Sequence, residues 1–185
     1  MSAASLPKLL TVDEFDRLPN PPGGVYELRH GELFFVSFPE KIHKELQRRL
    51  RKIIEAIAEQ AGVPGVTDTE FPYRPFPEHE LWSADVAFVS QERYDRIDRW
   101  LLGSPELVIE VKSPSNRKQE LNDKALTALA GGAYAVWIVD HETRSVTVFD
   151  HRNGMCRYQE PDAVPLELFP AVELPLSMLF PQAIW

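Results

Sequence analysis

The clearest hydrophobic pattern in the chain is a stripe of apolar residues between positions 41 and 61. Its members recur at every third or fourth residue, which is the spacing of one face of an α-helix. They are Ile42, Leu46, Leu50, Ile53, Ile57 and Ala61. Gly62 follows and is typical of a helix C-terminus. A second helix is predicted over Lys118–Ala130, where Gly131-Gly132 ends the pattern.

Runs of branched and aromatic residues predict several β-strands. Two such runs flank His30-Gly31, and glycine supplies the positive φ of a tight turn, so residues 25–36 are expected to form a hairpin. Leu107–Val111 is apolar apart from one acid, as in a central strand buried on both faces. Further strands are predicted over residues 66–73, 83–89, 135–139 and 145–149. The chain therefore has the pattern of an α/β protein.

The ends of the chain are less regular. Thr11 and Glu14 have the spacing of a capping box and predict a short helix start. Residues 158–185 are acidic and rich in proline, and they are expected to form an irregular wrap with a short strand or helix around a core of about residues 25–150. The 185 residues, 44% hydrophobic and 26% charged, have the composition of a globular protein. We expect one domain over residues 1–185.

Cysteine content and hydropathy exclude some classes of protein. Cys156 is the only cysteine, so neither an intrachain disulfide nor a cysteine-rich zinc site can form. No apolar run approaches the roughly 18 residues of a membrane span, and the N-terminus lacks the pattern of a signal peptide. These features predict a soluble, cytoplasmic protein with no membrane partner.

Charge is distributed unevenly along the chain. The formal net charge of −8 argues against a general attraction to nucleic acid. Residues 41–52 nevertheless carry six basic side chains and one acid, whereas residues 158–185 carry acids and no Lys or Arg. The basic segment is interpreted as a solvated helix face, with contact to DNA phosphates as the alternative.

Two acids stand inside predicted apolar strands, where an unpaired carboxylate is strongly destabilising. They are Asp85 and Glu110. A shared divalent cation would explain both, because Mg²⁺ prefers carboxylate oxygens. Residues i and i+2 of a strand point to the same face, so Lys112 is expected beside Glu110, where it could orient or deprotonate a water. The carbonyl of Val111 is a further possible ligand.

Asp85 followed by Glu110-x-Lys112 resembles the motif of the PD-(D/E)xK nuclease superfamily, with Ala84 in place of the proline. A longer series of blocks is similar to the bacterial family described as putative restriction endonucleases. The blocks are Tyr26-Glu-Leu, Gly31-Glu-Leu, Ala84-Asp-Val-Ala-Phe-Val, Pro105-Glu-Leu-Val-Ile-Glu-Val, Ser113-Pro-Ser, Asp123-Lys124 and Trp137-Ile-Val-Asp140.

The resemblance implies a restriction-endonuclease-like fold, with a mixed central β-sheet flanked by helices. It also implies Mg²⁺ (or Mn²⁺) and hydrolysis of phosphodiester bonds, with DNA as the expected nucleic-acid partner. Asp85 and Glu110 would hold the metal, Lys112 would position the hydrolytic water, and Glu27 would assist as a further ligand. In many relatives the lysine comes from the following helix, which here offers Lys124, so the choice of lysine stays open.

The alternative is a non-catalytic protein that keeps this fold and binds nucleic acid or a partner protein. The net acidity favours it, and the paired acids disfavour it. A homodimer is expected in either case. Glu27 and Lys124 could instead face solvent, and His43 is interpreted as a packing residue. If Asp85, Glu110 and Glu27 converge, at least one of them should have a raised pKa without metal.

Overall fold

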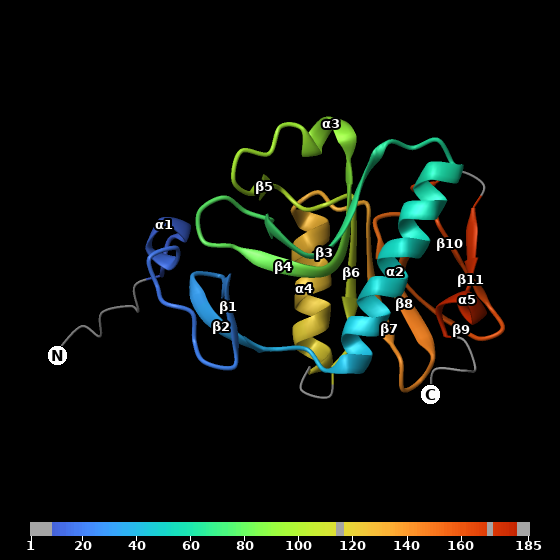
Figure 1. Cartoon of the computed structure of the whole chain (residues 1–185), viewed down its shortest axis with the longest axis horizontal. Helices are drawn as coiled ribbons and strands as arrows, with labels where there is room; N and C mark the ends of the chain where they lie inside the picture. Colours follow the sequence, from blue (N-terminus) through green and yellow to red (C-terminus); the bar gives the residue numbers. More distant parts are fainter. Residues whose placement is uncertain (1–8, 114–116, 170–171, 181–185) are drawn as a thin grey trace.

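A seven-stranded mixed β-sheet forms the centre of the computed structural model, which describes residues 9–113, 117–169 and 172–180 (Figure 1). The strand order is β5-β3-β4-β6-β7-β8-β9. β3 pairs with β5 and β6 with β7 in parallel, and the other neighbours are antiparallel. The strands are β3 (Gly65–Arg74), β4 (Trp82–Ser90), β5 (Leu101–Leu102), β6 (Leu107–Val111), β7 (Ala135–Asp140), β8 (Ser145–Asp150) and β9 (Gly154–Gln159).

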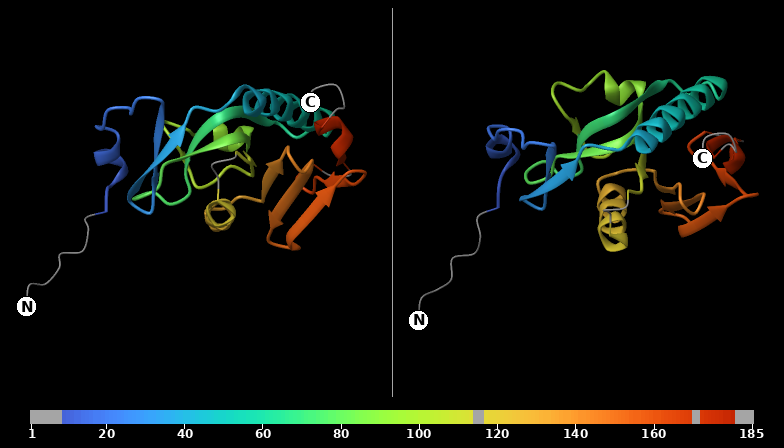
Figure 2. Two further views of the ribbon diagram at one scale, coloured as in Figure 1. Left: turned by 90° about the horizontal axis from the view of Figure 1, so that it is seen from below. Right: turned by 60° about the horizontal axis from the view of Figure 1, so that its bottom comes forward.

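Two long helices cover the two faces of this sheet, as Figure 2 shows. α2 (Lys41–Gln60) packs with Val86, Ile109 and the C-terminal segment in one hydrophobic cluster. α4 (Lys118–Ala130) packs on the opposite face with residues of β3, β4 and β7. A short helix, α3 (Gln91–Tyr94), follows β4. The predicted α/β fold, with a mixed sheet flanked by helices, is confirmed.

The buried stripe of α2 is rotated from the predicted one. Its fully buried apolar residues follow a four-residue spacing, whereas the predicted Ile53 and Ile57 are only partly buried. The buried apolar residues are Leu46, Leu50, Ile54 and Ala58. Gln47 is also buried, at 2% exposure, although it is polar. Its burial places a polar group of α2 against the sheet.

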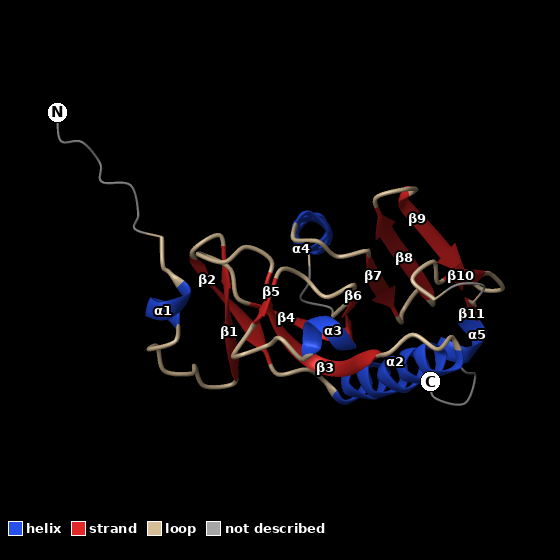
Figure 3. Ribbon diagram, turned by 90° about the horizontal axis from the view of Figure 1, so that it is seen from above, coloured by secondary structure: helices blue, strands red, loops and turns tan. Residues whose placement is uncertain are grey.

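The predicted hairpin is confirmed as β1 (Gly24–Arg29) and β2 (Glu32–Ser37), a separate two-stranded sheet. His30 and Gly31 both have positive φ in its turn. The hairpin lies at one end of the molecule beside the short helix α1 (Val12–Phe15), as Figure 3 shows. Thr11 and Glu14 form the predicted capping box. Main-chain hydrogen bonds between Leu28 and Leu81 attach the hairpin to the segment that leads into β4.

The C-terminal segment contains short strands and a short helix, in agreement with the prediction. It contains β10 (Ala163–Pro165), β11 (Glu173–Pro175) and the short helix α5 (Leu176–Leu179). Phe169 and Phe180 are fully buried in the cluster beneath α2. The predicted core of residues 25–150 was therefore too small, because this tail closes one face of the sheet.

Within the described residues, no helix is both long and apolar enough to cross a membrane. Of the family-like blocks, Pro114 and Ser115 lie outside the described residues.

Leu50 gives a test of this packing. It is completely buried between α2 and the sheet, so Leu50→Ala should lower the free energy of unfolding by about 2–5 kcal/mol. Leu126→Ala is the matched control, because Leu126 lies on α4 with 58% of its surface exposed. Its cost should stay within about 0.5 kcal/mol. Urea unfolding measures both, and equal costs would contradict the packing described.

Candidate active site

The ladder between β4 and β6 ends at two acidic residues. The paired residues are Val86–Ile109, Ala87–Val108 and Phe88–Leu107, so the pairing stops one position before Asp85 and Glu110. Beyond that point the Asp85 carboxylate takes the place of a main-chain acceptor, and its Oδ2 accepts the N–H of Val111 at 2.6 Å. The two acids therefore lie where two central strands part.

The backbone of β4 is irregular at Asp85. Residues two apart on a strand normally share a face, yet Ala84 and Val86 belong to different hydrophobic clusters. The neighbouring strand β3 is irregular at the same level, because Glu70 has a positive φ between the paired residues Thr69 and Phe71. Because of this irregularity, Asp85 and the next residue, Val86, both face α2.

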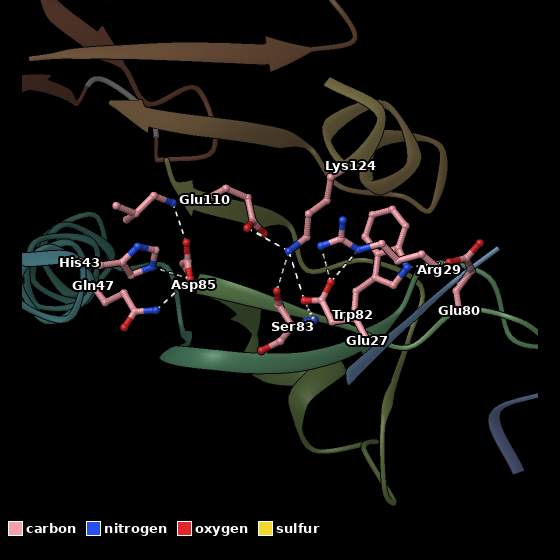
Figure 4. A network of polar contacts seen from close by, with 11 residues as sticks. Glu27, Arg29, His43, Gln47, Glu80, Trp82, Ser83, Asp85, Glu110 and Lys124 are labelled. Atoms are coloured by element: carbon pink, nitrogen blue, oxygen red, sulfur yellow. Dashed lines mark hydrogen bonds and ion pairs between the residues drawn. The ribbon is translucent and has the colours of Figure 1, made fainter. Parts of the chain in front are cut away.

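Asp85 takes its side-chain partners from α2 (Figure 4). Gln47 donates from Nε2 to Oδ1 at 2.9 Å. His43 Nε2 lies 2.9 Å from the same oxygen, although the ring nitrogen is not aligned as a hydrogen-bond donor. Burial alone would raise the pKa of Asp85, but the imidazole of His43, the Lys124 charge and the Val111 N–H outweigh it and lower this pKa. Asp85 is therefore held as a carboxylate.

Glu110 takes its partner from α4, on the other side of the sheet. Lys124 Nζ donates to Glu110 Oε2 at 2.9 Å and to the Ser83 carbonyl at 2.8 Å, and it lies 3.5 Å from Glu27 Oε1. Lys124 is 6% exposed. Burial disfavours its charge, but the carboxylates of Glu110 and Glu27 outweigh this effect and raise the pKa of Lys124. The lysine is therefore a buried ammonium with three acceptors.

Glu27 completes the cluster from the hairpin. Its Oε1 accepts the N–H of Ser83 at 3.0 Å, and its Oε2 accepts from Arg29 Nε at 2.7 Å. The Arg29 guanidinium also stacks over the Phe34 ring, 3.8 Å from its centroid. Glu27 is 4% exposed, so the alternative of a solvent-facing glutamate is wrong. Figure 4 shows the three acids arranged in a row, with Lys124 between Glu110 and Glu27.

The cluster contains one more acid than it has permanent cations. Asp85, Glu110 and Glu27 face Lys124 and Arg29, and Glu110 Oε1 is buried without a hydrogen-bond partner. Burial raises the pKa of Glu110 to about 8, Lys124 opposes the rise, and the charges of Asp85 and Glu27 add to it. The expectation of a raised pKa among these acids is met at Glu110.

Lys112 does not accompany Glu110. Its ammonium lies 2.8 Å from Asp140 Oδ2 and 3.8 Å from Glu142 Oε2, and its side chain is 35% exposed. Main-chain pairing with β7 continues at Lys112, whose N–H donates to the Val139 carbonyl, but its ammonium contacts Asp140 and not Glu110. The role of Lys112 beside a metal stays a prediction. Lys124, the alternative from the following helix, contacts Glu110 and does not face solvent.

Several residues of the cluster were not predicted from the sequence. His43 was interpreted as a packing residue, and Gln47, Ser83 and Arg29 were not singled out. One sequence signal was available for two of them, since His43 and Gln47 are four residues apart and therefore share a helix face. Ser83 contributes main-chain atoms, which leave no mark in a sequence.

The oxygen atoms of Asp85 and Glu110 are the candidate ligands for a divalent metal. Among the described residues, no three His, Cys, Asp or Glu side chains form a ready-made metal cluster. Mg²⁺, however, is commonly held by one or two carboxylates and completes its shell with waters and substrate phosphate. Asp85 together with the unbonded Oε1 of Glu110 fits that donor set. The carbonyl of Val111 as a ligand stays a prediction.

Comparison with known proteins identified a matching family and similar solved structures. Residues 12–183 match the Uma2 family, described as "putative restriction endonuclease". The chain is also similar to the crystal structure of a "putative nuclease" from Anabaena variabilis, with 21% sequence identity and a TM-score of 0.81. That match covers 92% of this chain and 97% of the other, and at this identity it supports the fold. No curated protein matches the chain.

The raised pKa of Glu110 gives a test in the absence of metal. Between its ordinary value of 4.5 and about 8, the folded protein binds a proton that the unfolded chain has lost. The contribution of Glu110 to the unfolding free energy should therefore fall as pH rises through this range. At about 1.4 kcal/mol per pKa unit, the fall should amount to a few kcal/mol.

Urea unfolding at several pH values, with EDTA present, measures this loss. Glu110→Gln should unfold with a flatter pH dependence and be at least as stable as the parent at pH 8. Glu59→Gln, at an exposed position of α2, should follow the parent. Identical pH profiles for the parent and Glu110→Gln would contradict the protonated cluster.

Proposed function

The chain belongs to the Uma2 family, described as putative restriction endonucleases, and from this membership we propose that it is a divalent-metal-dependent DNA endonuclease. The reaction is hydrolysis of phosphodiester bonds. The observation that carries the proposal is the buried carboxyl of Glu110, whose Oε1 has no partner and which lies beside Asp85 where β4 and β6 part. A purely structural ion pair would not need this unsatisfied oxygen.

The roles of the residues follow from their contacts. Asp85 and Glu110 would hold Mg²⁺ or Mn²⁺, which when bound lowers the pKa of a water and stabilises charge on a phosphate. Gln47 and the Val111 N–H fix the Asp85 carboxylate from two directions. Lys124 orients Glu110 and favours its carboxylate form, and Glu27 in turn holds Lys124. Glu27 acts here as a positioning residue.

Proton release accompanies metal loading in this proposal. Glu110 carries a proton near neutral pH because its pKa is raised to about 8, and a metal ligand must be deprotonated. A cation supplies the positive charge that the cluster lacks. Metal affinity should therefore increase as pH rises toward 8. DNA as the substrate, a homodimer that cuts both strands, and a cytoplasmic location stay predictions.

Cleavage by lysine variants tests the assignment of the active-site lysine. Lys124→Met removes the ammonium that contacts Glu110 and should lower plasmid cleavage with Mg²⁺ or Mn²⁺ at least about a hundredfold. Lys112→Met is the matched control, since it removes an ammonium bound to Asp140, and it should retain most activity. Glu110→Gln should be inactive. The reverse order of the two lysines would return the role to Lys112.

Thermal unfolding tests the metal independently of cleavage. Mg²⁺ or Mn²⁺ should raise the melting temperature of the parent, with a gain of about 2.7 kcal/mol at a hundredfold excess over the dissociation constant. Glu110→Gln should show a much smaller shift, because one ligand charge is lost. If millimolar metal shifts neither protein and no nucleic acid is cut, the non-catalytic binding protein becomes the better hypothesis.

A further inference from the structure

A polar cavity, separate from the candidate active site, lies at the end of the molecule formed by α1, β5 and the loop after α3. Its volume is about 500 Å³, within the ~300–1,000 Å³ range of small-molecule sites. Four arginines line it together with one tryptophan. They are Arg74, Arg93, Arg96, Arg99 and Trp100. None of these residues belongs to the cluster of Asp85, Glu110 and Lys124, so this cavity calls for its own explanation.

Three of the four arginines already have acidic partners. Arg93 lies 3.1 Å from Glu106, Arg96 lies 2.7 Å from Glu92, and Arg99 lies 2.8 Å from Asp16. These pairs explain why the three side chains are held at the cavity, and they need no ligand. Arg74 is the fourth arginine, and no ion pair explains its position at the cavity.

Arg74, at the end of β3, has no such partner. Within the described residues its guanidinium forms no ion pair, and its Nε is buried without a hydrogen-bond partner. The side chain is half-buried. A buried hydrogen-bond donor without an acceptor is destabilising. An anion in the cavity would supply that acceptor and an opposite charge for the guanidinium.

The acidic residues that line the cavity do not pair with Arg74. Asp16 is engaged with Arg99, while Asp13 and Asp98 are exposed residues whose charges are hydrated. Water therefore compensates those two carboxylates but does not reach Arg74 Nε. The unsatisfied group on the cavity wall is therefore the Nε donor of Arg74.

The shape of the cavity narrows the class of anion. Its volume is several times that of inorganic phosphate, and Trp100 supplies a flat, partly buried wall. Arg99 lies 5.1 Å from the Trp100 ring centroid, so one aromatic face is already positioned against a cation. Guanidinium groups bind phosphate through charge-assisted hydrogen bonds, and aromatic side chains stack on nucleobases.

We infer that this cavity binds a nucleoside phosphate, with Arg74 on the phosphate and Trp100 against the base. The inference stands apart from the proposed nuclease activity. The same chemistry is offered by a free nucleotide and by the 5′-phosphorylated end of a nucleic-acid strand, and binding experiments separate the two sources.

Calorimetric titration of the full chain in EDTA tests the inference, with adenosine 5′-monophosphate as the probe. The parent should bind it, and adenosine without phosphate should bind at least about tenfold more weakly. Arg74→Met, which keeps most of the apolar stem, should weaken binding by a similar factor. Arg48→Met is the matched control at an exposed arginine outside the cavity, and its affinity should equal that of the parent.

Melting temperatures show whether Arg74→Met fails for a structural reason. Without ligand this variant should melt at or above the parent's temperature, because it removes a buried donor that has no acceptor. Adenosine monophosphate should raise the melting temperature of the parent and not that of Arg74→Met. A variant that melts well below the parent without ligand would make Arg74 a structural residue and overturn the inference.

Short oligonucleotides with and without a 5′-phosphate identify the source of the ligand. Preference for the phosphorylated strand over the mononucleotide supports a strand end, and the opposite preference supports a free nucleotide. Absence of binding for all phosphate probes at millimolar concentration, or equal binding by Arg74→Met, overturns the inference. Glu110→Gln should bind the mononucleotide like the parent, so this result and the nuclease result fail or succeed separately.

Discussion

The ammonium group of Lys124 is a polar contact shared by four elements of the fold. Its three acceptors come from the hairpin, from β4 and from β6, while the lysine itself belongs to α4. A buried cation is stable only when its acceptors are in place, so each element constrains the position of the others. The hairpin illustrates this dependence, because Glu27 contacts both Lys124 and the Ser83 N–H of β4. The polar cluster is therefore a structural constraint as well as a candidate catalytic site.

Asp85 imposes a second constraint on the same place. Its carboxylate accepts the Val111 N–H beyond the end of the β4–β6 ladder, while Gln47 holds it from α2. The acid thus replaces main-chain pairing and keeps the two strands apart. The end of the ladder and the partly buried negative charge beside it arise from the same residue.

Part of this arrangement could be predicted from the sequence, and the remainder depends on tertiary structure. Asp85 and Glu110 were recognisable because an acid in an apolar strand contradicts its surroundings. Lys112 was chosen over Lys124 because strand alternation is a local rule, whereas the direction of a helical lysine depends on how the helix packs. β9 and the burial of the tail in the core escaped prediction, because Met155, Cys156 and the prolines give no regular apolar pattern.

The cluster around Glu110 has an unsatisfied acid, whereas the cavity at Arg74 has an unsatisfied cation. The two sites therefore suit ligands of opposite charge. At the parting of β4 and β6 the excess charge is negative, and a proton on Glu110 can neutralise it when no cation is present. Arginine has no comparable route, since it keeps its charge throughout the physiological pH range. The Nε donor of Arg74 therefore stays unsatisfied throughout this pH range until an anion binds. An uncompensated carboxyl can serve as a switch between proton and metal, whereas an uncompensated guanidinium in a cavity is useful only to a ligand of opposite charge.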